Sequence, residues 1–250
     1  MSADKTAGTD IGEQFQKLTA YVRATLKEWS PSWENQVGQF KDYPDAKGIE
    51  LPDPQVKGGE GLWNVIAHRR SYRDFEEDSI DIKQLSQLLW ACQGITGRTR
   101  NFFFRAAPSA GALYPVETYV IANHVEGLEM GLYHYDVPSH GLKLLSGGDQ
   151  RDRAMDAGLN QPVLYEAAAV FFWTAMVRRG SWKYHQRAWR YFYLDCGHLC
   201  QNLLLAAESL GLGASPVGAY FDDEAAELLK VNAAEEPVIY MAVVGPKAQT

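Results

Sequence analysis

Cysteine is scarce in this sequence. The 250-residue chain has three, Cys92, Cys196 and Cys200, and an odd number without a repeating spacing predicts reduced thiols rather than a disulfide framework. If the CGHLC stretch at 196–200 is helical, Cys196 and Cys200 share a face and His198 points away. No further cysteine or histidine cluster completes a tetrahedral site, so we expect small buried core residues and no metal.

Long hydrophobic runs are also missing. The longest, residues 167–177, is too short against the roughly 20 apolar residues that a membrane helix needs. The first residues, MSADKTAGTDIGEQ, are polar and acidic and lack the apolar core of a signal peptide. We therefore expect no membrane association and, by default, a cytoplasmic location.

An excess of positive charge is absent, with 24 Lys and Arg against 31 Asp and Glu and a net charge of -7. This balance excludes a general nucleic-acid binder, although a local basic patch can still bind one phosphate. The G-x-S-x-G, H-E-x-x-H and P-loop motifs are missing, and no G-x-G-x-x-G follows a strand. Hydrolase chemistry and a Rossmann site are thus not supported.

The N-terminal part differs in composition from the rest. Residues 1–13 are expected to be disordered, and the apolar spacing from Phe15 to Trp29 predicts one amphipathic helix. Residues 30–60 are rich in Pro, Gly and Asp and predict an extended, aromatic-bearing arm. We therefore divide the chain into an N-terminal extension, residues 1–40, and a single domain, residues 41–250.

Helices and strands mix in that domain without strict alternation. Asp81 and Gln84 form a capping-box pattern before a helix that ends at Gly94. Other helices are expected at 61–68, 151–158 and 187–210, with one more capped by Asp222, and strands are expected at 116–122, 132–135, 142–145, 168–174, 214–219 and 237–244. The pattern predicts an α+β fold: a three-layer α/β/α sandwich around one sheet.

Two segments have the chemistry of anion or flat-ring binding. Arg69, Arg70, Ser71 and Arg73 offer planar guanidinium donors and a hydroxyl that suit a phosphate, or form a solvated basic turn balanced by acidic residues 76–78. The small residues 108–113 let backbone amides approach a ligand closely, or form an ordinary turn.

Two further segments have both a functional and a structural interpretation. Residues 211–218 are a Gly/Pro turn after a long helix, suited to facing a heterocycle or simply to capping the helix. Lys183 and Tyr184 could exchange a proton if burial and nearby cations lower the pKa of the lysine. Arg178 and Arg179 are close in sequence, and Arg187 would share a face with Lys183 if the segment is helical. The alternative is a surface lysine beside a half-buried tyrosine.

These four segments, in this order, resemble the nitroreductase-like flavin family. RRSYRDF (69–75) resembles its flavin-phosphate motif, and APSAGALYPVETYV (107–120) resembles the SagB-type version of the loop that passes the flavin ring. Residues 194–224 resemble the core helix with its following turn, and VIYMAVVGPK (238–247) resembles the C-terminal strand. The match runs from about Lys41 to Lys247.

The resemblance implies a homodimer with flavin mononucleotide (FMN) at the subunit interface and a central, mostly antiparallel sheet. By matched position, the phosphate and ribityl chain are held by Arg69, Arg70, Ser71 and Arg73. The ring is lined by Pro108, Ser109, Ala110, Gly111, Ala112 and Leu113. Its reactive edge lies near Pro216, Val217 and Gly218, and a further basic contact is Lys247.

Lys183-Tyr184 resembles the pair with which the SagB-type branch oxidises azoline rings in modified peptides. The resemblance implies hydride transfer to FMN with Lys183 as base and Tyr184 as proton partner, and a cyclodehydratase partner that this chemistry normally requires. Two other functions stay open: an NAD(P)H-dependent reductase of nitroaromatics or quinones acting on small molecules, and a non-catalytic flavin-binding scaffold.

Overall fold

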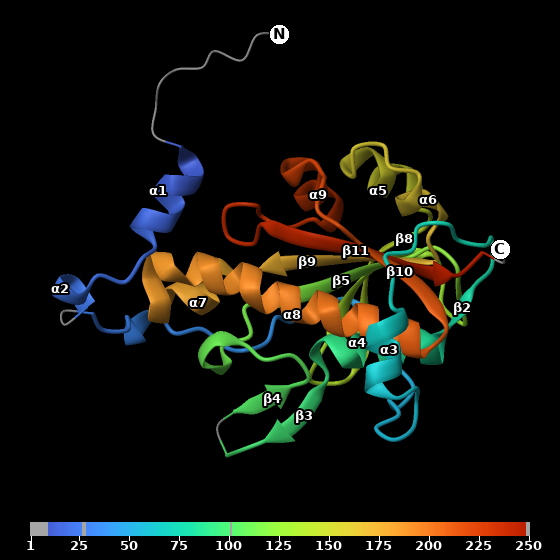
Figure 1. Ribbon diagram of the computed structural model, residues 1–250, viewed down its shortest axis with the longest axis horizontal. Helices are drawn as coiled ribbons and strands as arrows, with labels where there is room; N and C mark the ends of the chain where they lie inside the picture. The colour runs from blue at the N-terminus through green and yellow to red at the C-terminus, as the bar shows by residue number, and fades with distance from the viewer. Residues whose placement is uncertain (1–9, 27–28, 101, 249–250) are drawn as a thin grey trace, which may run out of the picture.

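The computed structural model describes residues 10–26, 29–100 and 102–248, and one antiparallel sheet runs through it (Figure 1). Its strands, in spatial order, are β1 (Lys47–Glu50), β8 (Gly141–Gly147), β7 (Gly131–Asp136), β5 (Val116–Ala122), β9 (Ala169–Ala175), β11 (Val238–Pro246) and β10 (Leu212–Val217). Two small sheets accompany it: β2 (Ile80–Asp81) with β6 (Val125–Glu126), and β3 (Ile95–Arg98) with β4 (Phe103–Arg105).

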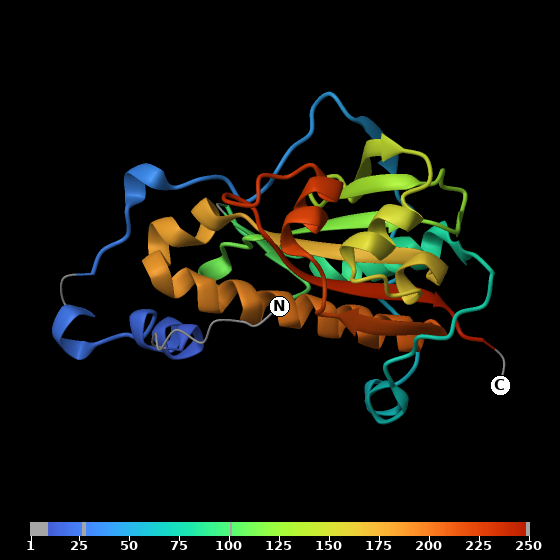
Figure 2. The same cartoon turned by 90° about the horizontal axis from the view of Figure 1, so that it is seen from above.

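Helices cover both faces of the large sheet. On one face lie α3 (Leu62–His68), α4 (Ile82–Gln93) and the long α8 (Ala188–Ser209); on the other lie α5 (Arg151–Ala157), α6 (Val163–Glu166) and α9 (Asp222–Leu229) (Figures 1 and 2). A hydrophobic core lies on each face of the sheet, and alternate residues of β5 point into one or the other. Val120 packs with α4 and α8, and Ile121 packs with the helices on the opposite face. The predicted three-layer α/β/α sandwich is confirmed.

Several local predictions are also confirmed. The side chain of Asp81 accepts from Gln84 N at 2.7 Å and the side chain of Gln84 from Asp81 N at 2.9 Å, a complete capping box. Every residue of β9 is buried, as the continuous apolar run predicts. Cys196 and Cys200 are buried on α8 while His198 is exposed.

The N-terminal prediction of one helix is wrong. Two helices, α1 (Ile11–Leu18) and α2 (Arg23–Leu26), are separated at Thr19, whose N–H and hydroxyl both donate to Phe15 O. The N–H bond is the last i→i−4 bond of α1, and Thr19 is the C-cap of that helix. Residues 1–9 of the segment expected to be disordered lie outside the described residues, but Ile11 already belongs to α1.

Other elements also differ from the prediction. The arm contains a short 3-10 helix, η1 (Trp33–Asn35), and the edge strand β1, which the sequence did not indicate. Strand β10 begins two residues early because Gly211, at φ 75°, turns the chain directly out of α8. Asp222 is the first residue of α9 rather than its cap, and its side chain makes no capping bond.

The remaining helical segments lie near the arm. They are η2 (Ala110–Ala112), α7 (Val177–Tyr184) and η3 (His185–Arg187). Figure 2 shows that the arm starts beside the N-terminal end of α8 and crosses to β1 at the far edge of the sheet. In the described part of the chain, no helix is long and apolar enough to span a membrane.

Candidate functional site

The arginine segment lies along β10. Ser71 forms a parallel bridge with Ala214, and Tyr72 N donates to Ala214 O at 2.9 Å. A Cβ atom at Gly213 would stand 2.6 Å from the Tyr72 ring, so glycine permits this close approach. The structure thus brings the predicted phosphate segment to the strand that carries Pro216 and Val217 and leads to Gly218.

The three arginines of this segment form no ion pair with the described residues. They are Arg69, Arg70 and Arg73, and Arg70 donates to the carbonyls of Ala67 and Arg69. Unpaired guanidinium groups suit an anionic group such as a phosphate.

Lys247 lies beside the same segment but is already paired. Its backbone forms an isolated antiparallel β-bridge with Phe75, and its Nζ lies 2.9 Å from Glu208 Oε2. Its assignment as a flavin contact stays a prediction.

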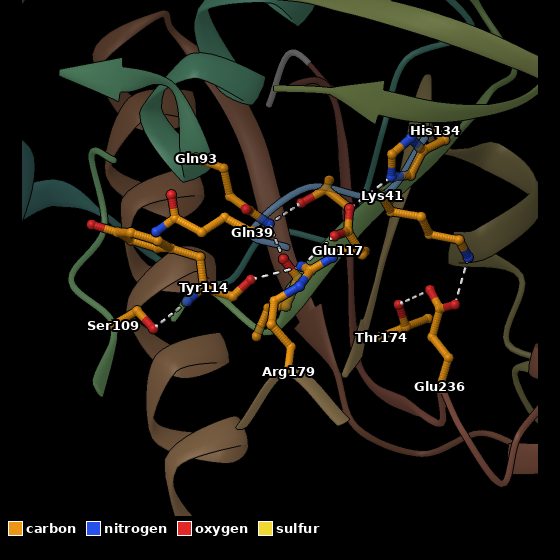
Figure 3. Close-up of polar contacts among 12 residues, drawn as sticks. Gln39, Lys41, Gln93, Ser109, Tyr114, Glu117, His134, Thr174, Arg179 and Glu236 are labelled. Atoms are coloured by element: carbon orange, nitrogen blue, oxygen red, sulfur yellow. Dashed lines mark hydrogen bonds and ion pairs between the residues drawn. The ribbon is translucent and has the colours of Figure 1, made fainter. Parts of the chain in front are cut away.

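The loop at 108–114 has a constrained backbone. Gly111, Ala112 and Tyr114 all have positive φ, at 63°, 54° and 49°, a region that costs a non-glycine residue energy. Side chains from distant segments hold it: Gln39 Nε2 donates to Ala112 O at 2.7 Å, and Arg179 donates to Tyr114 O at 2.8 Å (Figure 3). Such tethering fixes a loop that would otherwise relax.

The same loop meets the predicted catalytic pair. A Cβ atom at Gly111 would stand 2.6 Å from Lys183 Nζ and would collide with the Tyr184 hydroxyl. Lys183 Nζ also lies 5.4 Å from the centre of the Tyr184 ring. Both side chains are half-buried. The amine and the hydroxyl therefore sit together against the part of the loop predicted to line a ring.

The predicted cationic neighbours of Lys183 are arranged differently. Helix α7 ends at Tyr184, and His185 has φ 47°, so Lys183 and Arg187 do not share one helical face. Arg179 points into the core, where its Nη1 lies 2.5 Å from Glu117 Oε1. The guanidinium of Arg187 lies 5.0 Å from the Tyr21 ring.

Helix α8 joins the two halves of the candidate site. Its Asp195 accepts from Ser109 Oγ at 2.6 Å and from Ala110 N at 3.2 Å. Near its middle, burial raises the pKa of Cys200 to about 12, and the nearby charge of Arg69 opposes that rise. The ring-lining loop therefore contacts this helix at Asp195, and the charge of Arg69 acts on the same helix five residues farther on.

A buried polar network behind the loop was missed by sequence reasoning. Glu117 on β5 pairs with Arg179 and lies 2.7 Å from His134 Nε2, and nearby Glu236 pairs with Lys41 at 2.5 Å (Figure 3). The only sequence signal was a glutamate inside the otherwise apolar strand 116–122. Its partners lie too far away along the chain to be recognised.

Comparison with known proteins agrees with this fold. Residues 66–245 match the model of the nitroreductase family. MJ1384 of Methanocaldococcus jannaschii, named as a nitroreductase, is 35% identical over 200 residues, which cover 80% of this chain and 96% of that protein.

Two further similarities concern peptide processing. The trifolitoxin-processing protein TfxB of Rhizobium leguminosarum bv. trifolii is 33% identical over 125 residues, which are 44% of this chain and 31% of TfxB. A chain of the E. coli microcin synthetase McbBCD complex with truncated pro-MccB17 bound has the same fold, with a TM-score of 0.66 at 18% identity, covering 96% of this chain and 92% of that chain.

These similarities confirm the resemblance read from the motifs, including that to the SagB-type branch. The family model spans the arginine segment, the ring-lining loop, the Lys183-Tyr184 pair and α8 through most of β11. The chain belongs to the nitroreductase family.

Proposed function

We propose that this chain is an FMN-dependent oxidoreductase of the SagB type that oxidises azoline-like rings. The contact that carries the proposal is the meeting of Lys183 and Tyr184 with the backbone of Gly111. It brings a proton-transfer pair to the loop whose counterpart in the family passes the flavin ring.

The donor set fits FMN. The guanidinium groups of Arg69, Arg70 and Arg73, which form no ion pair within the described residues, would hold the phosphate and ribityl chain together with the Ser71 hydroxyl. Residues 108–113 would line the ring from one side, with 216–218 near its reactive edge. Bound FMN would accept the hydride that leaves one ring carbon of the substrate, since the redox chemistry belongs to the cofactor.

The chain's own residues would move the proton. Aromatising an azoline removes two hydrogens from adjacent ring carbons, one as hydride and one as a proton. Lys183 would take the proton, and Tyr184 would exchange it with the amine or the substrate. The tethered loop would keep both groups oriented toward the ring.

The relatives support a peptide substrate. TfxB is named for processing trifolitoxin, and the similar fold in microcin synthetase belongs to a complex with a bound precursor peptide. Because the chain spans about a third of TfxB's length, activity on a modified peptide and a cyclodehydratase partner remain part of the proposal.

The cofactor is tested by the absorbance spectrum of the purified protein. We expect flavin absorbance, and we expect Arg70→Ala to lower FMN retention because a phosphate contact is lost. Arg100→Ala, an exposed arginine outside the segment, should retain FMN fully. A colourless wild-type protein that does not bind added FMN would refute the flavin assignment.

The base is tested with Lys183→Ala. If Lys183 takes the proton, turnover of an azoline-containing peptide should fall by about 10²-fold or more while the flavin spectrum is unchanged. Lys83→Ala, an exposed lysine on α4, is the matched control. Full turnover in the Lys183→Ala variant would exclude this role.

A second function is favoured by the similarity to MJ1384. In an NAD(P)H-dependent reductase, the same flavin would pass electrons to nitroaromatics or quinones, and Lys183 would matter less. Rapid bleaching of the yellow protein by NADPH, unaffected by Lys183→Ala, would support this function. A flavin that neither reduces nor reoxidises would indicate a scaffold.

We also propose a homodimer with FMN at its interface. Large apolar side chains are exposed on α8 and α3, and patches of this kind mark interfaces. These residues are Tyr193, Leu194, Leu62, Trp63 and Ile66.

A further inference from the structure

Asp195 is a buried carboxylate at the junction of the loop and the catalytic pair. Only 4% of the residue is exposed, and it lies on α8 beneath Ser109 and Ala110. Ser109 Oγ donates to Asp195 and accepts from Tyr114 N at 2.9 Å. One carboxylate therefore fixes both ends of the loop around Gly111.

The carboxylate also lies near Tyr184. Asp195 and Tyr184 line one narrow space together with Ala110 and Tyr191. Burial raises the pKa of Tyr184, and the nearby Tyr191 and the charge of Asp195 raise it further. A negative charge close to a phenol disfavours the tyrosinate.

We propose that Asp195 is a positioning residue that tethers the loop at 109–114 and disfavours the tyrosinate form of Tyr184, so that Lys183 rather than Tyr184 takes the proton from the substrate. The assignment of Lys183 as the base rests on the proposed function. The tether and the charge effect do not, because they concern this chain's own residues.

Other charged groups around Tyr184 come from each packed element. From α7, Lys183 lies over its ring. From α8, Tyr191 stacks edge-on with ring centres 4.8 Å apart, and from the segment between α1 and α2, Tyr21 interacts with it electrostatically. Arg187 of η3 lies over the rings of Tyr21 and Tyr191 rather than of Tyr184. The cation of Lys183 therefore lies beside Tyr184 on one side, and the carboxylate of Asp195 acts on it from α8.

The negative charge of Asp195 is stabilised by hydrogen bonds and by the charge of His198, but by no contacting cation among the described residues. Burial raises its pKa, while the hydrogen bonds from Ser109 and Ala110 and the charge of His198 lower it. Among the described residues, it forms no ion pair. Its charge therefore acts on its neighbours without being neutralised by a contacting cation.

The test is a tyrosine titration that needs neither flavin nor substrate. Protein labelled with ¹³C at the tyrosine Cζ is titrated by NMR, and Tyr184→Phe assigns the resonance of Tyr184 among the 13 tyrosines. We expect the midpoint of Tyr184 to move to lower pH in Asp195→Asn. Ser109→Ala, which cuts the tether but keeps the charge, should leave that midpoint higher than in Asp195→Asn. Equal midpoints in wild type and Asp195→Asn would overturn the proposal.

A second measurement uses the wild-type protein, in case Asp195→Asn does not fold. The Tyr184 resonance should respond at acid pH as Asp195 takes up its proton, and no response would also overturn the proposal. The flavin spectrum is recorded separately. A colourless protein whose Tyr184 behaves as expected would reject the proposed function but not the role of Asp195.

Discussion

Glu117 carries its charge deep within the sheet. Burial raises its pKa, but Arg179, with His134 and Arg105, outweighs burial and lowers the pKa to about 2. A carboxylate with a depressed pKa in the folded state stabilises the protein above its ordinary pKa of 4.5, and this contribution is lost as the pH falls toward about 2.

We therefore expect Glu117→Gln to lower the free energy of unfolding at neutral pH by about 3–5 kcal/mol, because Arg179 keeps a buried charge without its carboxylate. Urea unfolding at several pH values would measure this. The difference from wild type should shrink between about pH 5 and about pH 3. A difference that is constant over this range would show that Glu117 is not ionised in the fold.

Gly111 is required for two separable reasons, its positive φ and its contact with the catalytic pair. Gly111→Ala should cost about 1–2 kcal/mol in backbone strain and should also displace Lys183 and Tyr184. Gly127→Ala is the matched control, since Gly127 has φ 84° but its Cβ would lie 3.8 Å from its nearest neighbour, Ile82.

Urea unfolding and turnover separate the two effects. We expect both variants to lose similar stability and only Gly111→Ala to lose turnover. Equal turnover in the two variants would mean that the Lys-Tyr pair does not depend on this close approach.

At the scale of elements, the N-terminal arm is held by contacts with α7. Ser32 N donates to Trp182 O at 2.7 Å, and the Trp33 ring lies 5.2 Å from that of Trp182. Farther along, Gln39 reaches Ala112 in the ring-lining loop. The arm thus supports the candidate site of its own chain.

Trp33→Ala should release the arm, because an aromatic pair contributes about 0.5–1.5 kcal/mol. Limited proteolysis followed by mass spectrometry should show faster cleavage between residues 19 and 41. Trp63→Ala, which removes an 80% exposed tryptophan from α3, should cleave like wild type. Unchanged cleavage in Trp33→Ala would mean that other contacts hold the arm.

Elements with local signals were predictable, and those without them were not. The capping box defined α4, and an unbroken apolar run defined β9. Strand β1 has neither signal: its residues are exposed or half-buried, and pairing with Leu142 and Leu144 of β8 makes it a strand. The apolar spacing likewise did not reveal that α1 ends at its C-cap, Thr19.

At the scale of the whole molecule, the site's parts were visible in sequence but their connections were not. The arginine segment and the Lys183-Tyr184 pair have recognisable residue types. Asp195 and Ser109 are 86 residues apart, and Glu117 and Arg179 are 62 apart. Only the tertiary fold determines which buried charge meets which loop, so the positioning residues could not be found from spacing.

The proposed dimer makes a prediction about the whole assembly. Leu194 is 59% exposed on α8, and a charge at the centre of an apolar interface opposes association. Leu194→Glu should therefore shift the protein toward monomer in light scattering. Because each FMN site would borrow residues from both chains, the same variant should release FMN on dilution.

Leu159→Glu is the control, since Leu159 is 43% exposed between α5 and α6, on the opposite face of the sheet from α8. It should remain dimeric and yellow. A Leu194→Glu protein that stays dimeric would remove α8 from the interface. A wild-type monomer that retains FMN would exclude the shared site altogether, because one chain would then supply every contact that the cofactor needs.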